Sequence, residues 1–379
     1  MTKLGVSASE AAARVPPAEL SSNFSAYLDL VRFSAAAMVV LHHVKLLQVG
    51  PDAVRKLIPS YGHEFVIVFF VLSGYVIAAT VDRKRQQGFK DYALDRAARI
   101  YSVSLPTLLL STLLSLTMVA TGSGGSGTLN DVGWAIALNL VFLAQSWGLN
   151  SVPPSNPAFW SLPYEVMYYV LYGCLYFLRG QQRLFWCALV ALVAGPKVLL
   201  LLPCWLAGVA AYRWRDSWAL PSWGCWLLVA SPVLVFGVLS YLHFGALMHS
   251  TLDRLLGPYY PGLAWSTEFP KDYISATFVA LHLFAVRKLD LSLPKRLNDA
   301  ATGAATLTFT LYLLHFPSIM LSRELFGSSS KSLQCFAFAI LLTIAVTVGV
   351  GTYSEARRWQ LRAWLQRHLV GPVRAARKG

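Results

Sequence analysis

Long apolar runs, separated by short polar connections, alternate along most of the chain. A helix needs about 20 consecutive apolar residues to cross the hydrocarbon core of a bilayer, and several runs are close to that length. They lie at residues 31–49, 61–81, 100–120, 223–244, 270–286, 303–323 and 333–354. No stretch between them is long enough for a separate soluble domain. The pattern predicts an all-α fold, a polytopic transmembrane helical bundle.

The segment between residues 132 and 213 allows two arrangements. It holds apolar runs at 132–148, 158–178 and 184–212. Either each run crosses the membrane once, or the first is re-entrant and the last divides into two short spans. Both arrangements give about ten spans with both termini cytoplasmic. The second is favoured because it keeps Arg179 and Arg183 on the cytoplasmic side.

Composition and charge narrow the class of protein. Hydrophobic residues make up 56% of the 379 residues and charged residues only 13%, about half the usual share in a soluble domain. The net charge of +14 comes from Lys and Arg in the connections, as the positive-inside rule describes for cytoplasmic loops. This distribution argues against a nucleic-acid partner. The five cysteines lie in or beside apolar runs without metal or redox spacing, so no metal site is expected.

The two ends of the chain differ from its middle. Residues 1–24 are polar and rich in Ala, Pro and Ser, without an apolar core before a cleavage site. They are predicted to be a disordered cytoplasmic tail rather than a signal peptide. Residues 25–356 form the predicted membrane domain, and residues 357–379 a basic cytoplasmic tail.

The first apolar run carries ionisable residues. Arg32 and His43 are eleven residues apart, or about three turns, so they share one helix face at a separation of about 16 Å. Asp29 falls on the same face, whereas His42 points about a quarter-turn away. Ionisable groups inside a membrane are costly and mark functional sites. We therefore expect Arg32 to be an anchored cation and His43 a titratable base.

The segment NPAFWSLPYEVMYY predicts a second polar face. Ser161, Glu165, Tyr168 and Tyr172 recur at intervals of four, three and four residues, so they line one side of a helix. A glutamate in such an apolar helix is neutral, paired with a cation or facing water. Glu165 therefore either belongs to a site or pairs with an arginine to hold two helices together.

The segment DYALDRAARIYSVSLP, just before the run at 100–120, is basic. Arg96 and Arg99 are three residues apart and share a helix face, so they form a two-pronged cationic site suited to phosphate groups. Alternatively, both arginines reflect only ordinary positive-inside topology.

Two shorter segments place further polar groups within apolar runs. In FFVLSGYVI, Ser73 and Gly74 permit close helix approach, and Tyr75 adds a hydroxyl. In TLYLLHFP, Tyr312 and His315 share a helix face. No serine-hydrolase elbow, zinc-binding HExxH, phosphate-binding P-loop or dinucleotide turn occurs in the sequence. We therefore expect no permanently bound cofactor.

Together these segments resemble the bacterial acyltransferase-3 family of integral-membrane O-acyltransferases, over residues 24–360. An Arg followed after ten residues by a His resembles the first-helix signature and falls on Arg32 and His43. FFVLSGYVI, DRAARIYSVSLP and TLYLLHFP are similar to its second-helix, basic-loop and late-helix segments. Its W-S-L-x-x-E-x-x-Y segment is matched by Trp160, Ser161, Leu162, Glu165 and Tyr168. Ser102 stands where the family's basic loop usually has Pro, which predicts a changed helix start.

The resemblance implies transfer of an acyl group, most often acetyl from acetyl-CoA, onto a hydroxyl of a glycan such as an exopolysaccharide or O-antigen. The enzyme would work in the bacterial cytoplasmic membrane with the lipid bilayer as a partner, and its acyl-CoA would be a donor rather than a resident cofactor. The family also has members fused to a soluble esterase-like domain, for which this chain is too short. A transporter or flippase of a lipid-linked or polyanionic substrate is the alternative. The lack of an internal repeat and the basic, phosphate-type segment argue against it.

The resemblance also assigns roles to individual residues. His43 is expected to take the proton from the acceptor hydroxyl, because an imidazole titrates near neutral pH. A covalent acyl-histidine relay is a less favoured version of this step. Arg96 and Arg99 are expected to bind the phosphates of CoA. Arg32 would steady the thioester end of the donor or pair with Asp29.

The remaining roles concern orientation and substrate contacts. Glu165 would orient the imidazole or hold a sugar hydroxyl. Trp160 and Tyr168 suit a stacking surface for a sugar ring. The residues expected to contact substrate are Asp29, Ser73, Tyr75, Trp160, Ser161, Tyr168, Tyr312 and His315.

Overall fold

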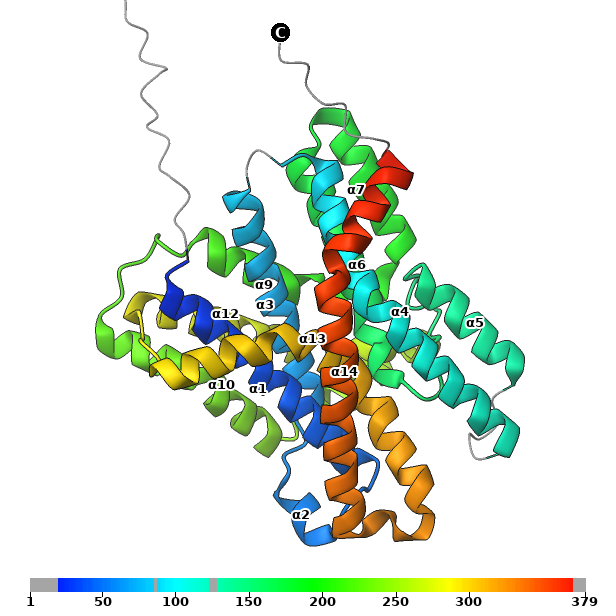
Figure 1. Cartoon of the computed structure of the whole chain (residues 1–379). Coiled ribbons are helices and arrows are strands. Elements are labelled where there is room, and N and C mark those ends of the chain that lie inside the picture. The colour runs from blue at the N-terminus through cyan, green and yellow to red at the C-terminus, as the bar shows by residue number, and fades with distance from the viewer. Residues whose placement is uncertain (1–19, 85–86, 123–127, 371–379) are drawn as a thin grey trace, which may run out of the picture.

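The computed structural model describes residues 20–84, 87–122 and 128–370, and this part of the chain is a bundle of helices without strands (Figure 1). The longer helices are α1 (Ser22–Leu46), α3 (Gly62–Arg83), α4 (Phe89–Thr121), α6 (Ser161–Phe177), α10 (Ser222–Tyr241), α12 (Phe269–Leu289), α13 (Lys295–Phe326) and α14 (Leu333–Leu365). The shorter helices are α2 (Asp52–Leu57), α5 (Leu129–Leu140), α7 (Gly180–Ala194), α8 (Pro196–Leu200), α9 (Leu202–Arg213) and α11 (Phe244–Leu256). The predicted all-α fold is confirmed.

Six helices in the described ranges are long and apolar enough to cross a membrane, namely α1, α3, α4, α10, α13 and α14. A seventh span is formed if α7 counts together with α8 and α9, although the two parts are bent by 108°. The multi-pass membrane bundle is therefore confirmed. The count of about ten spans and the cytoplasmic termini remain predictions.

The segment between residues 132 and 213 is broken rather than a row of straight crossings. The twelve residues of α5 extend over about 18 Å, less than the core of a bilayer of about 30 Å. The run at 184–212 bends between α7 and α8 at Gly195, whose φ is +79°. A side chain there would also lie 2.7 Å from the backbone nitrogen of Trp147. These features favour the predicted arrangement in which the first run does not cross and the last run is divided.

Helix α3 lies at the centre of the bundle and packs against α1, α6, α9 and α12. Its contact with α9 is a close backbone approach that two glycines permit. A Cβ on Gly74 would lie 2.0 Å from the carbonyl oxygen of Trp205, and one on Gly208 would lie 1.8 Å from that of Val71. The close helix approach predicted at Ser73 and Gly74 is thus confirmed.

We expect the substitution Gly208→Ala to destabilise the bundle by about 1–3 kcal/mol or more, because the added methyl group forces α9 away from α3. Thermal unfolding of the detergent-purified protein measures this loss. Gly349→Ala in α14 is the matched control, since a Cβ there meets no atom within 4 Å. Equal unfolding temperatures for the two variants would contradict the close approach of α3 and α9.

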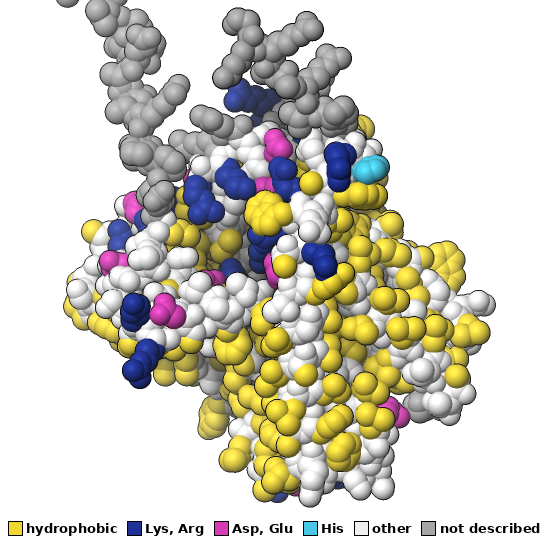
Figure 2. Space-filling view, in the orientation of Figure 1, with side chains coloured by type: hydrophobic (Ala, Val, Ile, Leu, Met, Phe, Trp, Pro, Cys, Tyr) yellow, Lys and Arg dark blue, Asp and Glu magenta, His cyan; other side chains and the backbone are white. Residues whose placement is uncertain are grey.

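The basic and apolar surfaces are separated along the bundle. Figure 2 shows most of the visible Lys and Arg side chains around a hollow on the upper half of this face, and hydrophobic side chains over its lower and right-hand parts. Helix α14 extends over about 50 Å, so it reaches well beyond a bilayer core of about 30 Å. The predicted tail at 357–379 therefore begins as helix up to Leu365, whereas residues 1–19 and 371–379 lie outside the described ranges.

Candidate functional site

A cavity of about 420 Å³ lies between α3, α4, α6, α13 and α14, and α1 contributes Arg32 to its wall. Along α3 its lining residues run from Val66 to Lys84, a length of about 27 Å. The lining cations are Arg32, Arg83, Lys84, Arg96, Arg99, Arg358 and Arg362. Only two carboxylates, Asp95 and Glu165, face these seven cations. The excess of positive charge suits an elongated anionic ligand.

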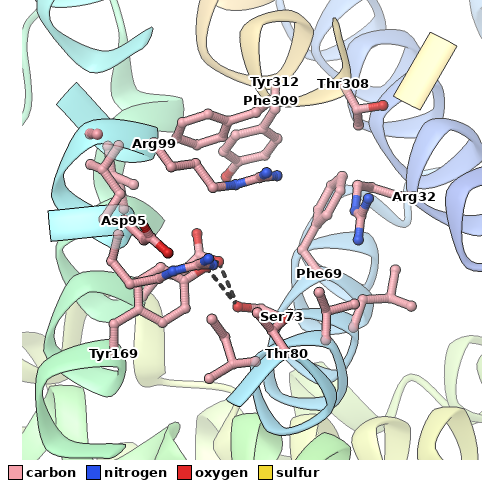
Figure 3. Close-up of a pocket in the computed structure, with 18 of the residues that line it drawn as sticks. Arg32, Phe69, Ser73, Thr80, Asp95, Arg99, Tyr169, Thr308, Phe309 and Tyr312 are labelled. Carbon is pink, nitrogen blue, oxygen red and sulfur yellow. Dashed lines mark hydrogen bonds between the residues drawn. The ribbon is translucent and has the colours of Figure 1, made fainter. Parts of the chain in front are cut away.

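The predicted pair of arginines on α4 is part of this cavity. Arg96 and Arg99 both line it, and Figure 3 shows Arg99 and Arg32 extending toward the same open space from opposite walls. The Nε atom of Arg96 is buried and has no hydrogen-bond partner among the described residues. A buried N–H group without an acceptor is costly, so the geometry favours an anionic partner supplied by a ligand. Positive-inside topology alone does not account for this inward-facing arrangement.

The C-terminal end of α14 supplies part of the cavity wall that the sequence prediction missed. Arg358, Trp359 and Arg362 line the cavity, although they belong to the segment predicted as a tail. The guanidinium of Arg362 donates to Asp95 of α4 over 2.5 Å, and Asp95 also accepts from Lys84 over 2.7 Å. The four-residue spacing of Arg358 and Arg362, which places both on one helix face, was the available signal.

Glu165 lies in the polar part of the cavity wall. It accepts a hydrogen bond from Ser73 of α3 over 2.6 Å and another from the hydroxyl of Tyr169. The dashed lines in Figure 3 end at the hydroxyl of Ser73, which also lies 3.0 Å from the hydroxyl of Tyr169. Glu165 makes no hydrogen bond to His43, because α6 packs against α3 and α4, whereas His43 faces α13. The role of Glu165 in orienting the imidazole or holding a sugar hydroxyl stays a prediction, and the structure places His315 against the His43 ring.

His43 and His315 form a hydrogen-bonded pair between α1 and α13. The Nε2 atom of His315 lies 3.0 Å from Nδ1 of His43, and each Nδ1 lies near a backbone carbonyl, at 2.9 Å from Val39 O and 3.2 Å from Leu311 O. A carbonyl only accepts, so in neutral rings both Nδ1 atoms carry the proton. The single Nδ1 proton of His43 is then shared between Val39 O and Nε2 of His315, and His43 keeps a lone pair on its own Nε2. No described residue hydrogen-bonds that nitrogen, which leaves it available as a base.

Tyr312 connects the histidine pair with the cavity. Its side chain lines the cavity, and its ring centroid lies 5.9 Å from that of His315. Its hydroxyl lies 2.7 Å from the hydroxyl of Ser161, another lining residue. The histidines themselves do not line the cavity, so Tyr312 marks the place where the cavity and the histidine pair meet.

Other predicted site residues lie outside the cavity wall. Asp29 pairs with Arg32 at 3.0 Å, which is the pairing expected for these two residues. Tyr75 is fully buried and packs against aromatic rings of α1 and α9. Trp160 is 5% exposed and stacks against Trp265, and Tyr168 is 1% exposed and donates to a backbone carbonyl. The predicted stacking surface for a sugar is therefore covered by protein in this structure.

Among the sequence-predicted residues, the cavity brings together Arg32, Ser73, Arg96, Arg99, Ser161, Glu165 and Tyr312. His43 and His315 meet behind them, and they had been predicted separately. Tyr169, one position beyond the predicted Tyr168, is the tyrosine of α6 that lines the cavity.

The chain was compared with protein families, curated proteins and solved structures. Neither a curated protein nor a solved structure matches it. One family matches, described as an acyltransferase domain, and its match covers residues 25–352. This range includes the cavity apart from Arg358, Trp359 and Arg362, and it includes both histidines of the pair. The chain is therefore a membrane protein that belongs to the acyltransferase-3 family.

Proposed function

We propose that this acyltransferase moves an acetyl group from acetyl-CoA onto a hydroxyl of a glycan. The observation that carries the proposal is a long basic cavity that reaches Tyr312, beside a histidine pair with a free Nε2. The basic mouth would face the cytoplasm of a bacterium, where acyl-CoA is made, as the positive-inside rule requires.

The donor fits the cavity by charge and by length. Its phosphates would bind Arg96 and Arg99 together with the cations of α14, and Trp359 offers a ring on which the adenine can stack. The pantetheine arm would follow the apolar wall of α3, where Val76 lies, toward Ser161. Arg32 would steady the thioester carbonyl as negative charge develops on its oxygen.

The histidine pair supplies the proton transfer. Nε2 of His43 would take the proton from the acceptor hydroxyl while its oxygen attacks the thioester carbonyl carbon. The carbon–sulfur bond then breaks, and the CoA thiolate leaves with the proton from the His43 imidazolium. His315 would hold the His43 ring in the required tautomer through the bond between the two rings. An acetyl ester and CoA are the products.

The test is a deletion strain complemented with either the wild-type protein or the His43→Ala variant at matched membrane abundance. Alkali-labile acyl esters on surface glycans and secreted metabolites are then quantified. Esters that disappear on deletion and return only with the wild-type protein support the proposal. An unchanged set of esters in the deletion strain would refute it and favour transport of a lipid-linked substrate.

A further inference from the structure

A second cavity, of about 550 Å³, lies at the other end of the bundle. Its wall includes Lys56 and Leu57 of α2, and Figure 1 shows α2 at the end of the bundle opposite to the C-terminal end of α14. The loop after α2, the end of α10 and the start of α11 complete the wall. Several lining residues are exposed, among them Lys56 and His243, so this cavity opens to the surface.

The two cavities share helix α3, which lines both of them. The basic cavity extends along α3 down to Val66, and the second cavity begins at Glu64, two residues farther along the same helix. His42, whose ring centroid is 5.2 Å from that of His43, lies against the start of α3. The ring of His42 packs on Gly62, since a Cβ there would lie 2.3 Å from it. His42 therefore contacts both His43 and the turn of α3 that carries Glu64, a lining residue of the second cavity.

The charge of the second cavity is not balanced. Its wall carries Lys45, Lys56 and Lys271 and one carboxylate, Glu64. Lys271 is neutralised, because it donates to Glu64 over 2.9 Å and also to Glu268.

Glu268 is ionised near neutral pH. Burial raises its pKa, but the hydrogen bond and the charge of Lys271 outweigh burial and lower the pKa below its ordinary value. Lys271 with its two carboxylates therefore carries one net negative charge, and Lys45 and Lys56 together exceed it by one positive charge.

The positive charge of Lys45 and Lys56 has no carboxylate partner in the described ranges. Lys45 donates to the backbone carbonyl of Ile58 over 2.6 Å, which fixes its position without neutralising it. Positive-inside topology does not account for these lysines, since they lie at the end opposite to the basic mouth. The fixed ammonium group of Lys45 and the exposed one of Lys56, in one open cavity, are suited to a carboxylate or a phosphate.

We infer that the second cavity binds the hydroxyl acceptor, and that this acceptor carries an anionic group held by Lys45 and Lys56. The inference rests on the proposed function, because it assigns the second substrate of the same reaction. It narrows the acceptor to an acidic sugar, bearing a carboxylate or a phosphate, that enters from the end opposite to the donor.

The test uses the full-length protein in nanodiscs of zwitterionic phosphatidylcholine. Methyl β-D-glucuronide and methyl β-D-glucoside are the probes, since they differ only in the acidic group. Binding is measured by saturation-transfer NMR, and transfer is measured with labelled acetyl-CoA. We expect the glucuronide to bind the wild-type protein about tenfold more tightly than the glucoside, as charge-assisted hydrogen bonds provide. The double variant Lys45→Gln with Lys56→Gln should lose this preference.

Lys331→Gln is the matched control. Lys331 is exposed at the same end of the bundle, where Gly50 donates to the carbonyl of Ser330, and it does not line the second cavity. The control should keep the preference for the glucuronide. An absent preference in the wild-type protein, or an equal loss in the control, would overturn the inference.

Two further results distinguish three uses of the second cavity: binding of an acidic acceptor, binding of an anion that is not acylated, and binding of a lipid headgroup. Lysine-dependent binding of the glucuronide without any transfer of labelled acetyl would overturn the acceptor role and leave only an anion site, whereas the proposed function itself fails only if the deletion strain keeps its acyl esters. Loss of glucuronide binding when phosphatidylglycerol is added to the nanodisc would overturn the inference in favour of a lipid headgroup. Unchanged binding in phosphatidylglycerol would support the acidic sugar.

Discussion

Replacing His43 with alanine is expected to lower the rate of acyl transfer by about 10²–10⁴-fold, the usual contribution of a positioned general base. The reason is the hydrogen-bond pattern of the two rings, in which Nε2 of His43 is the nitrogen left with a lone pair. The measurement is kcat with saturating acetyl-CoA for the purified variant. Binding of acetyl-CoA should be unchanged, because His43 does not line the basic cavity.

Two substitutions of His315 test whether this residue positions the ring of His43. It touches His43 and not the basic cavity, so we expect it to act as a positioning residue. The substitution His315→Gln can still accept a hydrogen bond from His43, and it should retain more activity than His315→Ala. A purely structural role would instead be seen as equal losses of activity and of thermal stability in both variants.

His282 provides the control for loss of a buried histidine. Its Nδ1 lies 2.8 Å from the carbonyl of Val229 and its Nε2 lies 2.6 Å from the hydroxyl of Tyr27, so its ring is also held on both sides. It lies outside both cavities, and His282→Ala should keep a kcat near that of the wild-type protein. If His43→Ala were as active as His282→Ala, His43 would not be the base.

Local patterns in the sequence were sufficient to predict several features of the site. The lengths of the apolar runs predicted the membrane bundle. The spacing of Asp29 and Arg32 placed them on one helix face, and their ion pair, one of the two alternatives given for Arg32, is present in the structure. The spacing of Arg96 and Arg99 likewise predicted two cations on one face, and both line the cavity. These features depend on distances of three or four residues along one helix, where the geometry is fixed by the backbone.

Contacts between distant helices could not be predicted in the same way. His43 and His315 are 272 residues apart, and their meeting depends on how α1 packs against α13. The periodicity of each helix gives its polar face without telling which helix that face meets. Tyr168 and Tyr169 follow Glu165 by three and four residues, and both spacings are compatible with one helix face. The packing of α6 against α3 shows that Tyr169 is the one that lines the cavity.

The C-terminal part of the cavity was missed for a different reason. Charged residues after the last apolar run are usually a solvated tail, so the segment from residue 357 was assigned to one. In the structure α14 continues past the bilayer length, and Arg362 bonds to both Asp91 and Asp95 of α4. To predict an ion pair that holds a helix extension in place, one must know which helix carries the partner residue. The sequence alone did not provide this.

Replacing Arg96 with methionine is expected to raise the KM for acetyl-CoA by about 10- to 100-fold, because the variant loses charge-assisted hydrogen bonds to a phosphate. Methionine keeps most of the apolar stem of the side chain, so packing within α4 should be preserved. The buried, unpartnered Nε of Arg96 is the observation behind this expectation. Initial rates at varied acetyl-CoA concentration measure KM, and kcat should change much less.

Acetyl-pantetheine has the thioester but lacks the nucleotide. Comparing it with acetyl-CoA shows whether Arg96 binds the phosphates of the donor or has only a structural role. Wild-type protein should use acetyl-CoA far better than acetyl-pantetheine, and Arg96→Met should lose most of that difference while using acetyl-pantetheine as well as the wild type does. Arg183→Met is the matched control, since Arg183 is exposed and lies outside the cavity. If Arg96→Met reduced kcat/KM equally for both donors, Arg96 would support the fold of the cavity and the phosphates would have to bind elsewhere.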